Sequence, residues 1–416
     1  MISRTRTLLA SVVGTTLEFY DFMLYAVFLE IIGNEYFPGN DYQTNQIFGY
    51  IGFAAALVMR PFGASIFGHI GDRLGRRKAL ILSISLMGIP TFLIGVMPSY
   101  ASWGISASIL LVFCRLLQGL CTGGEYNGSA IFALEHVGKR YPGFTGGLIT
   151  GASVIGAFLA TAMGILCRQP WMPTWSWRLA FCLGGFVSLV GLYIRLYTKE
   201  SPEFEKMKKN RGKNAVQKSP LLKAITRDWA SSGTTIVTGT LNGVLSYTLF
   251  KFVDVYLHEF LDVSIVKTLE YSLIGISTYV FAAPFMGFVL DKVGSKRMMM
   301  ISCVFVFAMA IPLYYFFQIK DTMFLVLAQI LLAFMVGSIS GPEHAFVQTL
   351  FPVEDRYSGV AFNYSLGMAI GGGMGPVLMK ALTLQTQNLY SPAYVIMVVA
   401  VICFGSLYLR GKKAFY

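Results

Sequence analysis

The chain contains twelve apolar runs of about 20 residues or more, and this succession restricts its fold more than any other feature. A helix needs about 20 mostly apolar residues to cross the hydrocarbon core of a bilayer. We predict spans at residues 8–32, 46–70, 79–98, 104–135, 143–167, 176–198, 231–257, 267–290, 298–316, 322–350, 357–381 and 391–410. The expected fold is therefore all-α and integral to the membrane.

Composition supports this reading. Of the 416 residues, 55% are hydrophobic and only 13% are charged, which is far from the make-up of an ordinary soluble globule. The first run carries Glu18 and Asp21 and lacks a convincing small-residue cleavage site, so we predict an uncleaved first helix rather than a signal peptide. The six cysteines show no C-x-x-C spacing, and neither a metal site nor a disulfide framework is expected.

The net charge of +12 invites a nucleic-acid interpretation, but the distribution of lysine and arginine excludes it. These residues gather in alternate loops, beginning with Arg4 and Arg6, and are densest between the sixth and seventh runs. Such a bias follows the positive-inside rule. We therefore predict that the protein lies in the inner membrane of the cell, with both termini in the cytoplasm.

The chain also repeats itself. Residues 68–77 read G-x-x-x-D-R-x-G-R-R, and residues 287–297, which begin 219 positions later, read G-x-x-x-D-K-x-G-S-K-R. The pair Glu125 and Glu343, each third in a G-(G/P)-E triplet, keeps nearly the same offset. We predict two pseudo-symmetric six-helix bundles, residues 1–198 and 231–416, joined by a basic cytoplasmic linker at 199–230 and enclosing a central cavity.

The two basic turns are candidates for gating. A carboxylate beside guanidinium groups near a helix end can lock one conformation through charge-assisted hydrogen bonds, although a plain positive-inside anchor would have the same sequence. The candidate gating residues are Gly68, Asp72, Arg73, Gly75, Arg76, Arg77, Asp291, Lys292, Gly294 and Arg297.

Ionisable residues within the apolar runs form the other candidate site. Each costs roughly 2.5–3.5 kcal/mol at the bilayer centre unless it is paired or hydrated, so each suggests a function. They are Glu18, Asp21, Arg60, Arg115, Glu125, Lys251, Asp254 and Glu343.

Helical spacing places these residues on three polar faces. The first helix carries Glu18, Asp21 and Tyr25; the fourth carries Arg115, Gln118, Thr122, Glu125 and Ser129; and the seventh carries Tyr247, Lys251, Asp254 and His258. A water-filled pathway requires such faces, with arginine suited to a carboxylate substrate and buried acids to a proton. The alternative is structural ion pairing, of Lys251 with Asp254 and of Arg115 with Asp21 or Glu125. His344, beside Glu343, is either a proton relay or a polar cap.

Two groups of motifs resemble known transporters. The repeated basic turn is similar to the pattern of the major facilitator superfamily. Residues 13–25 resemble the G-N-x-x-E-W-(F/Y)-D-F-x-x-Y helix of its metabolite:H+ symporter branch, and residues 115–126 match the branch pattern R-x-x-Q-G-x-x-x-G-G-E-Y. Known members carry proline/betaine, alpha-ketoglutarate, citrate and shikimate. Here Thr15 replaces the asparagine of that pattern, and the charges at Lys251 and Asp254 are unusual in osmolyte carriers.

The resemblance implies proton-driven uptake, with coupling at Glu18 and Asp21 and binding or coupling at Arg115 and Glu125. Our first expectation for the substrate is a small organic acid, a di- or tricarboxylate or a citrate-like chelate. A zwitterionic osmolyte or amino acid, export, and a transporter-like nutrient receptor are the alternatives.

The expected site is made of proton-coupling and substrate-binding residues. The proton-coupling candidates are Glu18, Asp21, Glu125, Glu343 and Asp254, and the substrate-binding candidates are Arg115, Gln118, Tyr25, Tyr126, Tyr247 and Lys251. We expect a monomer that is driven by the proton gradient, uses no cofactor or metal, and is not an enzyme, because no nucleophile constellation or phosphate-cradling loop is present.

Overall fold

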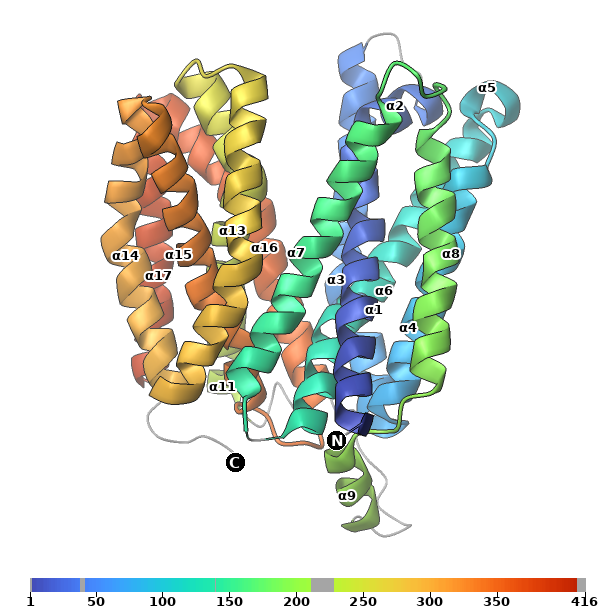
Figure 1. The fold of residues 1–416 in the computed structure, drawn as a ribbon, viewed down its shortest axis with the longest axis vertical. Helices are drawn as coiled ribbons and strands as arrows, with labels where there is room; N and C mark the ends of the chain where they lie inside the picture. Colours follow the sequence, from blue (N-terminus) through green and yellow to red (C-terminus); the bar gives the residue numbers. More distant parts are fainter. Residues whose placement is uncertain (1, 38–41, 139, 211–227, 410–416) are drawn as a thin grey trace. The chain divides into compact units, whose positions relative to one another are not determined.

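The computed structural model describes residues 2–37, 42–138, 140–210 and 228–409, and every long element in these ranges is a helix (Figure 1). Ten helices are long and apolar enough to cross a membrane, and a bent pair makes an eleventh span. The remaining long helix is α16 (Arg356–Thr386), which is richer in glycine and polar residues. The predicted all-α membrane fold with twelve spans is confirmed.

The described chain forms two compact units. Residues 1–136 and 152–221 make up the first, and residues 137–151 and 222–416 make up the second. Helix α7 (Pro142–Cys167) therefore contributes its first turns to the second unit and the rest to the first. Residues 211–227 of the predicted linker, and the basic residues at 410–416, lie outside the described ranges.

The first unit is built from the remainder of the N-terminal half. Its elements are α1 (Ile2–Val27), α2 (Leu29–Tyr36), α3 (Tyr42–Arg73), α4 (Arg76–Val96), α5 (Tyr100–Trp103), α6 (Ile105–Val137), α8 (Trp177–Leu196) and α9 (Pro202–Asn210). Helices α1 and α2 meet at a bend of 62° beside Phe28, so the predicted first span is broken near its end.

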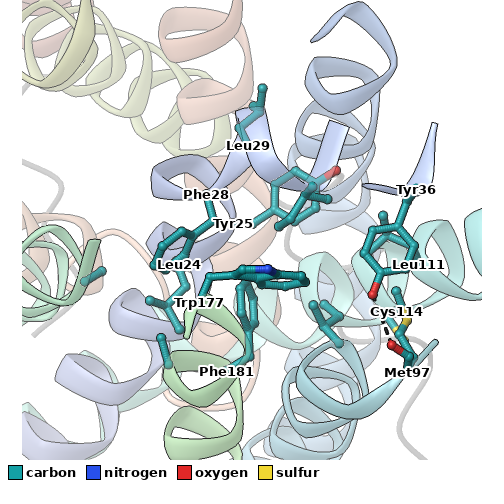
Figure 2. Close-up of a cluster of buried hydrophobic side chains, with 14 of the residues drawn as sticks. Leu24, Tyr25, Phe28, Leu29, Tyr36, Met97, Leu111, Cys114, Trp177 and Phe181 are labelled. Carbon is teal, nitrogen blue, oxygen red and sulfur yellow. Dashed lines mark hydrogen bonds between the residues drawn. The ribbon is translucent and has the colours of Figure 1, made fainter. Parts of the chain in front are cut away.

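An aromatic core holds that bend. Figure 2 shows Trp177 and Phe181 of α8 beside Phe28, and the ring centroids of Phe28 and Phe181 lie 6.2 Å apart. The Tyr36 hydroxyl donates a hydrogen bond to the carbonyl oxygen of Met97, 3.2 Å away, at the end of α4. Burial of these large rings fixes α1 and α2 against α4 and α8.

The second unit begins with an irregular span. Helix α11 (Trp229–Tyr247) continues through η1 (Thr248–Phe252), α12 (Val253–Val255) and η2 (Tyr256–Phe260), where η marks π-helical turns. The unit then contains α13 (Ile265–Val293), α14 (Ser295–Ile319), α15 (Thr322–Gln348), α16 and α17 (Ser391–Leu409). π-Helical turns often occur at functional sites.

Glycine allows close helix packing in this unit. A Cβ atom at Gly367 or Gly371 of α16 would overlap the backbone of α11 at Ile236 or Thr240. Contact between the two backbones at these positions is possible only because glycine has no side chain.

Candidate functional site

A buried hydrogen-bonded chain joins three helices of the first unit. Arg115 of α6 donates from Nη1 to Oε1 of Gln118 (2.8 Å), and Gln118 donates from Nε2 to Oγ1 of Thr91 on α4 (2.8 Å). Thr91 in turn lies 3.3 Å from Oδ2 of Asp21 on α1. We call these four residues the Arg115–Asp21 chain; the sequence predicted three of them, and Thr91 was missed.

Arg115 is fully buried but its guanidinium group is not fully bonded. Its Nε donates weakly to the carbonyl oxygen of Gly52 (3.4 Å), and its Nη2 has no hydrogen-bond partner. The guanidinium carbon lies 4.0 Å from the centre of the Tyr25 ring, a cation–π contact. The alternative in which Arg115 pairs with Asp21 or Glu125 is not seen, because no such ion pair occurs in the described part of the chain.

The two acids of α1 are both buried. Asp21 accepts a second hydrogen bond from Oγ of Ser188 on α8 (3.2 Å), but its Oδ1 has no partner. Neither carboxyl oxygen of Glu18 has a partner, and this residue is only 2% exposed. A buried carboxyl group without a cation or donor is more stable with a proton.

Arg60 lies among the aromatic rings of α1. Its guanidinium carbon is 4.4 Å from the centre of the Phe22 ring, and its Nε and Nη2 have no hydrogen-bond partner. Tyr126 of α6 contacts the neighbouring Phe19 edge-on, with ring centroids 5.3 Å apart. The first unit thus places two incompletely bonded arginines, two acids and several aromatic faces together.

Glu125 pairs with Arg195 of α8, a residue that was not among the candidates predicted from the sequence. Arg195 donates from Nη1 to Oε2 of Glu125 (2.8 Å), and the two form an ion pair in which both side chains are buried. Ser83 and Ser129 also donate to this carboxylate. Breaking such a buried pair typically costs about 3–5 kcal/mol, so Arg195 holds the Glu125 side chain firmly in place.

The polar residues predicted to share one face of the seventh span lie in different environments. Lys251 lies in η1 and is exposed, while the half-buried Asp254 accepts a hydrogen bond from Ser272 of α13. The alternative of a Lys251–Asp254 ion pair is not seen among the described residues, where the Asp254 carboxylate is bonded to Ser272 instead. Tyr247 lies at the end of α11, where a Cβ atom at Gly372 of α16 would touch its ring.

Glu343 of α15 has only neutral partners. Its Oε1 accepts from Nδ2 of Asn242 on α11 (2.8 Å) and from the hydroxyl of Tyr364 on α16 (2.7 Å). His344 is buried beside it, with its ring centroid 6.1 Å from that of Tyr364. The pseudo-symmetric acids Glu125 and Glu343 therefore have opposite environments, one cationic and one neutral.

The first basic turn is tied to the segment after α8. Arg76 is fully buried and lies 3.1 Å from Asp72 and 3.4 Å from Glu135, and its guanidinium group stacks on Phe204 of α9. The backbone N–H of Arg77 donates to the carboxylate of Glu200 (3.2 Å). Of the other candidates in this turn, Gly68 is buried and Arg73 is exposed.

The second basic turn makes different contacts. Asp291 accepts hydrogen bonds from the backbone N–H groups of Gly143 (2.7 Å) and Phe144 (2.9 Å) in the first turn of α7. Lys292 lies over the Phe288 ring at 4.6 Å, and Arg297 is exposed. A carboxylate at a helix N-terminus interacts favourably with the unbonded N–H groups there.

The residues missed by sequence reasoning share one cause. They are Thr91, Ser188, Arg195, Asn242 and Tyr364, and none of them belongs to the polar faces that the sequence analysis singled out. Each functions through a partner on another helix, so only the packing of the helices reveals it. No group of three or more potential metal ligands occurs within the described residues.

Comparisons with known proteins agree with this arrangement. Residues 7–410 match the family described as "Sugar (and other) transporter". The chain is 31% identical over 408 residues to the glycine betaine/proline/ectoine/pipecolic acid transporter OusA of Dickeya dadantii (strain 3937), which covers 95% of this chain and 81% of that protein. It is 32% identical over 404 residues to the inner membrane metabolite transport protein YhjE of Escherichia coli (strain K12), covering 92% and 89%.

A solved structure shares the fold. The proton:xylose symporter XylE, bound to 6-bromo-6-deoxy-D-glucose, superposes with a TM-score of 0.78 at 15% identity and covers 99% of this chain and 96% of XylE. The human organic anion transporter MFSD10 gives a TM-score of 0.66 at 14% identity, covering 97% and 99%. The chain is therefore a multi-pass membrane protein and belongs to the sugar (and other) transporter family of the major facilitator superfamily.

Proposed function

We propose that this secondary transporter carries out proton-coupled uptake of a small zwitterionic carboxylate, such as an amino-acid or betaine osmolyte, across the bacterial inner membrane. The observation that carries the proposal is the Arg115–Asp21 chain. It connects an arginine that has a spare donor to an acid that has a spare oxygen, and both groups are buried. Binding at one end changes the hydrogen bonding at the other.

The chain supplies a route for coupling. Thr91 has one hydroxyl proton and two acceptors within reach, Oδ2 of Asp21 (3.3 Å) and the carbonyl oxygen of Met87 (3.0 Å). When Asp21 is charged, Thr91 donates to it; when Asp21 is protonated, Thr91 accepts from it and donates to Met87. Gln118 donates to Thr91 in both states, so the chain from Asp21 to Arg115 stays connected whether or not Asp21 carries the proton.

The substrate class follows from the groups around Arg115. Its bare Nη2 provides a donor for a substrate carboxylate. The unpartnered oxygens of Glu18 and Asp21, with the faces of Tyr25 and Phe22, suit the cationic end of a zwitterion. Relatives named for proline, betaine and ectoine favour this class over the organic acid that the sequence first suggested.

An organic acid remains the second candidate. Arg60 has two unpartnered nitrogens and would supply a second cation beside Arg115, which a dicarboxylate requires. The exposed Lys251 adds positive charge in the second unit.

If the two basic turns act as gates, Asp72 and Asp291 stabilise one conformation of an alternating-access cycle by charge-assisted bonds.

The test is uptake by a single purified chain in proteoliposomes. Labelled proline, glycine betaine and ectoine would be compared with citrate and alpha-ketoglutarate, with and without an inward proton gradient. We expect gradient-driven accumulation of at least one zwitterion. Accumulation of the di- or tricarboxylates alone would select the second candidate, and uptake that ignores the gradient would remove proton coupling.

A further inference from the structure

Glu343 is a fully buried acid in the second unit, at 0% exposure. The groups that face it come from α11, α13, α16 and α17. They are Asn242, Tyr279, Tyr364 and Cys403, with Cys303 of α14 behind Cys403 and His344 next along α15. No lysine or arginine contacts it within the described residues.

The hydrogen bonds around Glu343 fit a neutral carboxyl group. Two donors converge on Oε1, which behaves as the carbonyl oxygen, while Oε2 has no partner. Nδ2 of Asn242 uses its two hydrogens on Glu343 and on the Tyr364 hydroxyl (2.7 Å), and Oδ1 of Asn242 accepts from Ser246 (3.0 Å). Every hydrogen of Asn242 and Tyr364 is thus assigned, and Oε2 is left to carry the proton.

The matching acid in the first unit shows what ionisation requires. Glu125 lies 218 positions earlier and is held by Arg195, Ser83 and Ser129. Glu343 has no equivalent of Arg195 among the described residues. A buried carboxylate is stable only when a cation compensates its charge, so Glu343 keeps its proton until water or a cation reaches it.

We propose that Glu343 is a second proton-binding site, separate from the acids of α1, and that its proton is exchanged during the transport cycle. This inference rests on the proposed function, because exchange of the proton presumes a proton-coupled cycle. A glutamine would accept the same two hydrogen bonds at Oε1, so a purely structural role does not call for an acid here. The site binds a proton, and Tyr364 positions the Glu343 carboxyl group that accepts it.

The first test is infrared difference spectroscopy of the purified protein in lipid, between acid and alkaline pH. Wild-type protein should show the C=O band of a protonated buried carboxyl group. Glu343→Gln should remove one component of the C=O absorption, and Tyr364→Phe should shift that same component because one hydrogen bond to Oε1 is removed. A component from the acids of α1 should stay in both variants. Glu125→Gln is the matched control and should leave that component in place. A C=O absorption that is unchanged in Glu343→Gln, or that loses the same component in the control instead, would overturn the assignment.

The second test is the proton-to-substrate ratio, measured from reversal potentials in proteoliposomes. Glu343→Gln should lower the ratio by one proton while substrate exchange across the membrane continues. If that component is lost but the ratio is unchanged, the proton is static and the inference fails. If wild-type transport shows no proton coupling with any substrate, the proposed function fails, and the infrared result still reports whether Glu343 holds a proton.

Discussion

Arg115 has more donors than the protein uses, and this excess defines its chemistry at the residue scale. Gln118 takes Nη1, the Gly52 carbonyl takes Nε, and Nη2 remains bare above the ring of Tyr25. A planar guanidinium group can hold Gln118 and a substrate carboxylate at once, whereas a lysine ammonium group is a single mobile charge.

We therefore expect Arg115→Lys to weaken substrate binding by at least tenfold, which corresponds to about 1.4 kcal/mol. The measurement is equilibrium binding to purified protein in lipid, with folding checked by thermal unfolding. Arg178→Lys is the control, because Arg178 belongs to the same unit but pairs with Glu35. Wild-type affinity in the Arg115 variant would assign this arginine to a structural role.

The acids of α1 give a second prediction at this scale. Glu18 and Asp21 are buried on one helix, and the free energy of ionising both carboxyl groups together in a low-dielectric interior is high, so we expect one to keep a proton. We expect Glu18→Gln or Asp21→Asn to abolish accumulation against a gradient while gradient-independent exchange partly survives. Glu35→Gln, which removes an acid paired with Arg178, should retain accumulation. Concentrative uptake by both variants would shift the coupling role to the other buried acids.

At the scale of elements, the two basic turns share a sequence pattern, but their aspartates make different contacts. Asp72 pairs with Arg76 one helical turn later, whereas the position that matches Arg76 in the second turn is Ser295. Asp291 is therefore available to accept hydrogen bonds from the first turn of α7. One substitution within the motif explains the difference.

Asp72→Asn should slow transport about tenfold, because the loss of a charge-assisted bond is worth about 1.5 kcal/mol or more. Substrate affinity should change only a few-fold, since Arg76 keeps Glu135 and the turn still folds. Initial uptake rates over a range of substrate concentrations separate the two effects. Asp321→Asn, at the start of α15, removes the same charge elsewhere and serves as the control. A normal turnover rate for the Asp72 variant would argue against a gating role for Asp72.

The glycines of the two turns form a matched pair. Gly75 and Gly294 have nearly the same backbone conformation, with φ of 115° and 94°, which side chains rarely adopt. A Cβ atom at Gly75 would collide with Glu200, while one at Gly294 would meet nothing within 4 Å. Alanine should cost about 1–3 kcal/mol of backbone strain at either position.

Gly75→Ala should therefore lower the thermal unfolding temperature more than Gly294→Ala does. The difference in unfolding temperature between the two variants measures how much the contact between the basic turn and the segment that leads into α9 contributes to stability. Equal shifts would mean that this contact contributes nothing to stability.

At the scale of the whole molecule, lysine and arginine gather in alternate loops, and this bias predicts the orientation of the chain in the membrane. A fluorescent protein fused after Tyr416 should fold and fluoresce, because we expect the C-terminus in the cytoplasm. Alkaline phosphatase fused at Gln169 should be active, since that loop is expected on the opposite side. Phosphatase activity in a fusion made after Tyr416 instead would contradict the proposed topology.

Much of this architecture was accessible from local sequence. The length of an apolar run and the spacing of polar residues along a helix are properties of consecutive residues, so the helices could be predicted from the sequence. The burial of Glu18, Asp21, Arg115, Glu125 and Glu343 agrees with their positions in apolar runs. The same logic located the polar stripe of α6, from which Arg115 and Gln118 contact each other directly.

The partners of those charges were decided only by the tertiary structure. Glu125 pairs with Arg195, which lies 70 positions later, and Glu343 contacts Asn242, which lies 101 positions earlier. Helical spacing says which side chains share a face but not which helix lies against that face. Since a buried carboxyl group is charged beside a cation and neutral beside an amide and a phenol, two acids with the same motif acquire different chemistry only when the helices pack.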